Sequence, residues 1–184
     1  MALSNPLVYI DTNVFVNKII LPLISPATIT QNQTNLLRQT DNFLHDLVVG
    51  VYRGVTSTFT RTEYRGVMKR ELSHQINRAL THAEEQAVLQ DFDTLTNKYG
   101  IGISDSDFLI NSQTTFNIFN ETDNTVKNCT MSWTNNKWRN IGGADALTIN
   151  LAILTGVNKL ATFDLGFTGV TIPNLDILLV QNEY

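Results

Sequence analysis

The segment that most narrows the possible folds of this 184-residue chain is a short apolar run, Leu7–Ile10. All four of its residues are apolar, and the polar tripeptide Asp11-Thr12-Asn13 follows it directly. An uninterrupted run of this length is typical of a strand that is buried on both faces and ends at a polar turn. Because such strands belong to parallel sheets with helices on either side, the run favours an α/β fold.

Strand and helix patterns alternate along most of the remaining sequence. The predicted helices span residues 14–20, 34–52, 60–77, 81–99 and 144–155, and the predicted strands span residues 55–59, 159–163 and 176–180. Thr60 and Glu63 have the spacing of a capping box, which predicts that the third helix begins at Thr60. Such alternation is typical of crossover connections between parallel strands. The sequence therefore predicts one domain, residues 1–184, with a three-layer α/β/α fold whose central layer is a mainly parallel sheet.

Residues 112–138 interrupt this alternation. Asn and Thr dominate the segment, its apolar residues are scattered, and its pattern supports a hairpin at most. We expect these residues to form an insertion in the domain.

Composition excludes several classes of protein. The single cysteine, Cys129, rules out an intrachain disulfide and a cluster of thiolate metal ligands. With 17 acidic and 13 basic residues, the net charge of -4 offers no overall basic field to nucleic acid, so any such contact has to be local. The apolar runs are far shorter than the roughly 20 residues that span a bilayer, and the first residues lack the charged start of a signal peptide. We expect a cytoplasmic protein with no membrane segment.

Four acidic residues fall where predicted strands end or predicted helices begin. Asp11 and Asp164 each follow a strand, whereas Glu63 and Asp145 each lie in the first turn of a helix. Because the carboxyl ends of parallel strands meet at one edge of a sheet, these four side chains can converge there. Each also has a purely local explanation: a turn for Asp11 and Asp164, the capping box for Glu63, and the helix dipole for Asp145.

Taken together, four converging carboxylates favour a metal site. Like charges at close range disfavour ionisation, and a fold tolerates the cluster when cations neutralise it. Ligands that are all oxygen suit Mg²⁺ or Mn²⁺, which also bind phosphate oxygens. The expected chemistry is phosphoryl transfer.

The motifs around these acids resemble those of the PIN-domain ribonucleases, the family that includes VapC-like toxins. The resemblance is carried by Tyr9-Ile10-Asp11-Thr12-Asn13, Thr62-Glu63-Tyr64, Gly143-Ala144-Asp145-Ala146-Leu147 and Ala161-Thr162-Phe163-Asp164. It implies an endonuclease that uses Mg²⁺ or Mn²⁺ to cut single-stranded RNA and leaves a 5′ phosphate and a 3′ hydroxyl. The resemblance further implies an antitoxin protein as a possible partner.

The resemblance also assigns roles to single residues. Asp11, Glu63, Asp145 and Asp164 would be the catalytic, metal-binding acids, and Asn13 and Thr162 would orient the carboxylates or the phosphate. Members of the family are often homodimers. The apolar face formed by Phe43, Leu44 and Leu47 looks larger than one helical hairpin needs, so we expect a homodimer.

Two further features have competing interpretations. Arg61, Arg65 and Lys69 recur at four-residue spacing on the helix of Glu63, where they would either hold an RNA backbone or form a solvated helix face. In the predicted insertion, Trp133 and Trp138 would stack bases, contact a partner or a second copy, or serve as packing anchors.

Two alternatives to a nuclease remain. The first is a catalytically silent PIN-like module that binds RNA or a protein. The second, a phosphatase with an aspartyl nucleophile at Asp11, is disfavoured because residue 13 is Asn where such enzymes carry a second acid. A nucleophile elbow and a P-loop are both absent from the sequence.

Overall fold

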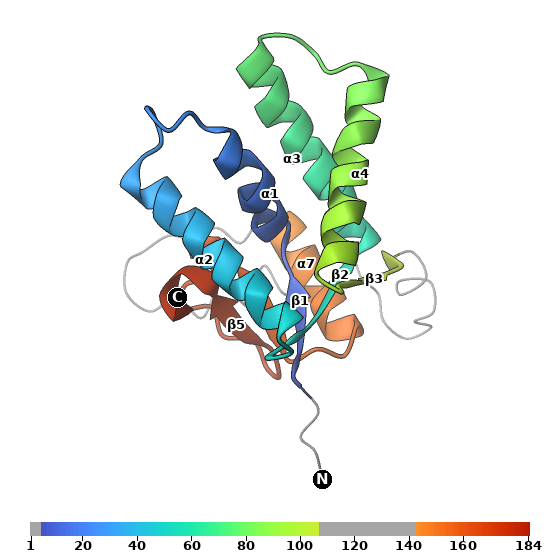
Figure 1. The fold of residues 1–184 in the computed structure, drawn as a ribbon. Coiled ribbons are helices and arrows are strands. Elements are labelled where there is room, and N and C mark those ends of the chain that lie inside the picture. Colours follow the sequence, from blue (N-terminus) through green and yellow to red (C-terminus); the bar gives the residue numbers. More distant parts are fainter. Residues whose placement is uncertain (1–4, 107–142) are drawn as a thin grey trace.

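A computed structural model describes residues 5–106 and 143–184, so the predicted insertion at residues 112–138, with Trp133 and Trp138, lies outside the described residues. Within them the fold is α/β, with a five-stranded sheet in the order β3-β2-β1-β4-β5 (Figure 1). Every strand pair is parallel, as the sequence predicts. The strands are β1 Leu7–Ile10, β2 Arg53–Ser57, β3 Gly102–Ser104, β4 Lys159–Thr162 and β5 Asp176–Leu179.

Helices cover both faces of the sheet (Figure 1). The α-helices are α1 Thr12–Ile20, α2 Gln31–Val48, α3 Thr58–Ile76, α4 His82–Lys98, α7 Gly143–Leu154 and α8 Val180–Glu183, and the short 3₁₀ helices are η1 Leu21–Leu23 and η2 Leu165–Phe167. Alternate residues of β1 face opposite layers, because Val8 and Ile10 pack with α1 to α4 whereas Tyr9 packs with α7. The three layers follow directly from this alternation.

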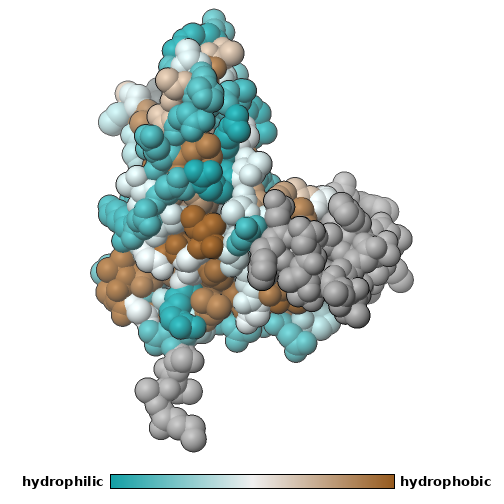
Figure 2. Space-filling view, turned by 90° about the vertical axis from the view of Figure 1, so that its right-hand side faces the viewer, coloured by the Kyte–Doolittle hydropathy of each residue, from teal (hydrophilic) through white to brown (hydrophobic). Residues whose placement is uncertain are grey.

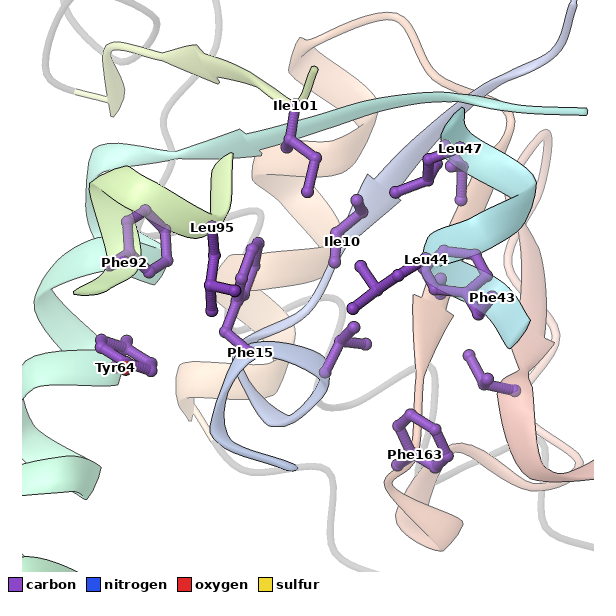
Figure 3. Close-up of a cluster of buried hydrophobic side chains, with 14 of the residues drawn as sticks. Ile10, Phe15, Phe43, Leu44, Leu47, Tyr64, Phe92, Leu95, Ile101 and Phe163 are labelled. Carbon is purple, nitrogen blue, oxygen red and sulfur yellow. The ribbon is translucent and has the colours of Figure 1, made fainter. Parts of the chain in front are cut away.

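The larger core lies between the sheet and helices α1 to α4. Figure 3 shows Phe15 of α1 beside Phe92 and Leu95 of α4, with Ile10 of β1 next to Leu44 of α2. The ring centroids of Phe15 and Phe92 are 4.7 Å apart, within the range of favourable aromatic pairs.

One premise of the expected homodimer is wrong. The apolar face of α2 is already covered within the chain, since Phe43, Leu44 and Leu47 belong to the larger core and are 0%, 2% and 8% exposed. The expectation of a homodimer therefore rests on the family resemblance alone.

Several predicted boundaries shift in the structure. Helix α3 begins at Thr58 with Ser57 as its N-cap, and the Ser57 hydroxyl accepts from the Thr60 amide at 3.3 Å. The predicted capping box of Thr60 with Glu63 is therefore wrong, because a hydroxyl residue three positions earlier caps the helix first. Helix α2 is capped at Thr30 and ends at Val48, four residues before its predicted end. Strand β3 was not predicted, since its three residues are too short for a pattern.

The strand order contains one switch point. From β1 the chain moves outward through β2 to β3 and then returns to place β4 on the other side of β1. The connection that leaves β1 and the connection that leaves β4 therefore run in opposite directions from the carboxyl ends of these two strands. In open α/β sheets that divergence creates the crevice where ligands bind.

The polarity of the surface differs from one part of the molecule to another. Helices α3 and α4 form a hairpin that projects beyond the sheet (Figure 1), and Figure 2 shows its far end as mostly hydrophilic, with more apolar surface lower on the same face. Among residues 5–106 and 143–184, none of the helices is both long and apolar enough to cross a membrane.

Candidate active site at the switch point of the sheet

Asp11 lies at the switch point, directly after β1. It is the N-cap of α1, and its Oδ1 accepts from the Thr12 amide at 2.7 Å. Its Oδ2 accepts from the Thr162 hydroxyl, at the end of β4, at 2.6 Å. Since Asp11 is 8% exposed, both oxygens are held in a nearly buried position.

Thr162 joins Asp11 to the rest of the crevice. Its Oγ1 accepts from Asn13 Nδ2 and from the Asp164 amide, both at 3.0 Å. Asn13 in turn accepts from the Phe163 amide through Oδ1 at 3.0 Å. Because Thr162 already accepts two hydrogen bonds, its single hydroxyl hydrogen goes to Asp11, which must act as the acceptor. The two polar residues predicted to orient carboxylates therefore lie in one network with Asp11.

Glu63 joins the same edge through the residue after Asp11. It lies in the second turn of α3, and its Oε2 accepts from the Thr12 hydroxyl. The local explanation for Glu63 as a capping residue fails, because Ser57 caps the helix. Asp11 therefore contacts the end of β4, and its neighbour Thr12 contacts α3, so this one turn connects the two elements.

Electrostatics place a third acid near this pair. The pKa of Asp11 is raised to about 7, first by burial and then by the negative charges of Glu63 and Asp145, while hydrogen bonds from Thr162 and Thr12 oppose the shift. Asp145 lies in the first turn of α7, on the other face of the sheet. Glu63 and Asp145 therefore both act on the charge of Asp11.

Asp164 behaves differently. Its Oδ1 accepts from the Gly166 amide at 2.6 Å, which makes Asp164 the N-cap of η2. Within residues 5–106 and 143–184, no three His, Cys, Asp or Glu side chains lie close enough together to hold a metal ion. The four predicted acids thus share one edge of the sheet without forming a closed set of ligands.

A cluster of hydroxyl groups beneath the acids was not predicted. Tyr9 Oη lies 2.6 Å from Ser57 Oγ and 3.0 Å from Thr60 Oγ1, and all three residues are buried. The cluster ties β1 to the start of α3, the helix that carries Glu63. Its only signal in the sequence is a set of hydroxyl residues near strand ends, which is too common to identify a cluster. Thr12 was missed for the same reason.

The three predicted RNA-binding cations lie between α3 and α4. Arg61 makes two bonds to Asp93, at 2.8 and 2.7 Å. Arg65 and Lys69 both pair with Glu85, at 2.5 and 2.6 Å, and their hydrogen bonds lower the pKa of this carboxyl to about 2. Each cation is thus already paired with an acid of α4, whereas the prediction of RNA contact remains open.

Comparison with known proteins adds no relative. The sequence matches no protein-family model, and no curated protein is detectably similar to it. The functional argument therefore depends on the geometry of the site and on its motifs.

Proposed function

We propose that the chain is a metal-dependent endoribonuclease with a PIN-like fold that cuts single-stranded RNA. One observation carries the proposal: Asp11, nearly buried at the switch point, is held by Thr162 while its neighbour Thr12 holds Glu63. The switch point is where an open α/β sheet binds its ligand. Acidic residues whose pKa is shifted strongly at such a position are typical of functional sites.

The donor set suits a divalent cation such as Mg²⁺ or Mn²⁺. Within residues 5–106 and 143–184, the hydrogen bonds to Asp11 Oδ2 and to Glu63 come from hydroxyl oxygens, and neither carboxylate forms an ion pair with a Lys, Arg or His. Hard cations prefer such oxygen ligands. Burial and the repulsion from Glu63 and Asp145 raise the pKa of Asp11, and a cation would relieve that repulsion.

Each residue then has a defined task. Asp11, Glu63 and Asp145 would hold the cation, with Asp164 as the fourth predicted ligand. When bound, Mg²⁺ or Mn²⁺ would polarise the scissile phosphate and lower the pKa of a water molecule. Thr162 and Asn13 fix the orientation of the Asp11 carboxylate, so that little reorganisation is needed when the substrate binds.

The partners follow from the same resemblance. A VapC-like enzyme would be held inactive by an antitoxin protein and would form a homodimer. Arg61, Arg65 and Lys69 would reach RNA only by exchanging their acidic partners on α4 for phosphates.

A second candidate is a catalytically silent PIN-like module that binds RNA or a protein. It is favoured by Asp164, whose carboxylate caps η2, and by the lack of a three-acid ligand group in the described residues. Such a module would bind without cutting and without needing a cation.

Incubation of the protein with a mixed pool of single-stranded RNA separates these candidates. We expect cleavage in Mn²⁺ or Mg²⁺, none in chelator, and 5′ phosphate ends in the sequenced products. Asp11→Asn and Glu63→Gln should each lower the rate by about a hundredfold or more, because each removes a charged ligand.

Asp91→Asn is the matched control, since Asp91 is an exposed acid of α4. Its rate should equal that of the wild type. Cleavage that persists in chelator, or an Asp11→Asn variant as active as the Asp91→Asn variant, would exclude the site. RNA binding without cleavage in any metal would favour the silent module.

A further inference from the structure

A groove opens at the opposite end of the strands from the acids. It lies where β2 begins, next to the ends of α2 and α4, and has a volume of about 460 Å³. The side chains and backbone that matter here belong to Val48, Tyr52, Arg53, Lys98, Tyr99 and Gly100. Because the strands are parallel, the whole length of β2 separates the groove from the candidate active site. The groove is therefore a separate feature of the molecule.

The two helices beside the groove end in the same way. In α2 the Val51 amide bonds the Asp46 carbonyl at 2.8 Å, and in α4 the Ile101 amide bonds the Thr96 carbonyl at 2.8 Å. Gly50 and Gly100 lie between, with φ of 79° and 63°, values that glycine adopts at little cost. Both ends thus follow the Schellman pattern.

The end of α2 leaves apolar side chains in solvent. Val48, Val49 and Val51 are 60%, 57% and 46% exposed, and Val48 lines the groove directly. Three neighbouring aliphatic side chains at such exposure mark a surface that a partner can cover.

The charges at this surface are unbalanced. Of the ten Lys and Arg residues in the described parts of the chain, seven form ion pairs with acids, and the three that do not are Arg38, Arg53 and Lys98. Two of these three line the groove. Lys98 Nζ lies 5.3 Å from the centre of the Tyr99 ring, a contact that leaves its charge uncompensated by any acid. The chain as a whole is acidic, so this local excess of positive charge stands out.

We propose that this groove binds an acidic, apolar segment of another protein. Aliphatic side chains of the segment would pack on the exposed valines, and its carboxylates would pair with Arg53 and Lys98. A nucleic acid strand fits less well, because the ends of α2 and α4 each add about half a negative charge and so leave too little positive charge for a run of phosphates. The remaining positive charge matches one or two carboxylates rather than a run of phosphates.

Selection of a displayed library of random dodecapeptides on the wild-type protein tests the proposal. We expect the selected peptides to combine Asp or Glu with Leu, Ile or Val. In fluorescence anisotropy the double variant Arg53→Glu, Lys98→Glu should bind them at least tenfold more weakly, because like charges would then face one another. Val48→Thr should weaken binding by about fivefold through the loss of apolar contact.

The matched control is Arg38→Glu, which reverses the third unpaired cation at a position that does not line the groove. It should bind the peptides as the wild type does, and melting curves should show that all variants fold alike. The proposal fails if no peptide is selected, if the selected peptides lack acids, or if both charge variants bind equally well. It also fails if a uridine oligomer binds the groove more tightly than the peptides do.

Discussion

At the scale of single residues, the hydroxyl of Thr162 determines how the candidate site is held. It donates to Asp11 and accepts from Asn13 and from the Asp164 amide, so one oxygen atom connects three site residues. Buried polar groups that lose such a partner cost far more than the hydrogen bond itself contributes. Substitutions that keep the shape and remove one oxygen atom therefore probe the network directly.

Thr162→Val is the most informative of these substitutions. It leaves Asp11 Oδ2, Asn13 Nδ2 and the Asp164 amide without their partner, so we expect a loss of about 3 kcal/mol in the free energy of unfolding. Urea denaturation measures the change. Thr40→Val is the control, since Thr40 is equally buried but donates only to the Leu36 carbonyl of its own helix. If both variants lost the same stability, Thr162 would be an ordinary core residue.

Two buried tyrosines make a second pair of tests. Tyr64 is fully buried, and its Oη is the one buried side-chain N or O atom of the described residues without a hydrogen-bond partner, whereas Tyr9 Oη has two partners. Tyr64→Phe should therefore leave stability unchanged or raise it by up to about 1 kcal/mol, and Tyr9→Phe should lower it by about 1–2 kcal/mol. Thermal or urea unfolding of both variants checks the contrast, and a larger loss for Tyr64→Phe would contradict it.

At the scale of elements, ion pairs fasten α4 to α3 along the hairpin. Glu85 accepts from both Arg65 and Lys69, and Arg61 holds Asp93 with two bonds. The hairpin projects beyond the sheet, so part of its length lacks the support of the central layer (Figure 1). Charge pairing along the hairpin therefore matters more than it would on a helix that packs fully on the sheet.

The depressed pKa of Glu85 predicts how this fastening depends on pH. The folded pKa is about 2, below the ordinary value of 4.5, so the stabilisation is fully present above about pH 4.5 and is lost as the pH falls towards 2. Glu85→Gln should melt at a lower temperature than the wild type at pH 7, and the difference should shrink between pH 4.5 and pH 2.5. Melting curves at these pH values measure it. A difference independent of pH would show that the charge of Glu85 contributes nothing.

At the scale of the whole molecule, segments far apart in the sequence supply the candidate site. Asp11 directly follows the first strand, Glu63 comes from the hairpin, and Asp145 and Thr162 come from the last third of the chain. The repulsion of Asp11 by Glu63 and Asp145 is a property of the folded protein, because an unfolded chain holds these residues far apart. Under the proposed function, a bound cation would offset the free energy that this repulsion costs the folded protein.

Glu63→Gln tests this cost. Because the folded pKa of Asp11 is raised to about 7, its contribution to stability is greatest below pH 3.8 and is lost as the pH rises through 7. In chelator at pH 8, Glu63→Gln should melt higher than the wild type, since it removes one repelling charge and its amide oxygen still accepts from Thr12.

Adding Mn²⁺ should then reverse the order. The wild type should gain about 2.7 kcal/mol at a hundredfold excess of Mn²⁺ over its dissociation constant, and Glu63→Gln should gain less. Differential scanning calorimetry in chelator and in Mn²⁺ measures both effects. If the melting temperature of the wild type did not change with Mn²⁺ at any pH, a cation would have no role at this edge of the sheet.

The sequence by itself determined the layers and the location of the candidate site. The apolar run Leu7–Ile10 predicted β1 within its observed bounds, and the alternation of patterns predicted the parallel sheet. Asp11, directly after β1, and Asp164, two residues after β4, indicated the edge of the sheet where Asp11 and Thr162 meet. The local sequence pattern was sufficient for these predictions, because burial on both faces of a strand and a polar turn after it depend on only a few consecutive residues.

Only the tertiary structure decided which donors and acceptors form hydrogen bonds and ion pairs with one another. Ser57 rather than Thr60 caps α3, which frees Glu63 for Thr12, and Asp164 caps η2. The sequence left open whether Arg65 and Lys69 hold RNA or form a solvated face, and in the structure they pair with Glu85 on the neighbouring helix. Three of these contacts, Thr12–Glu63, Arg65–Glu85 and Lys69–Glu85, join side chains 16 to 51 positions apart, and local spacing carries no information about such distant partners. The fold brings the partners together, and the network at the switch point is the result.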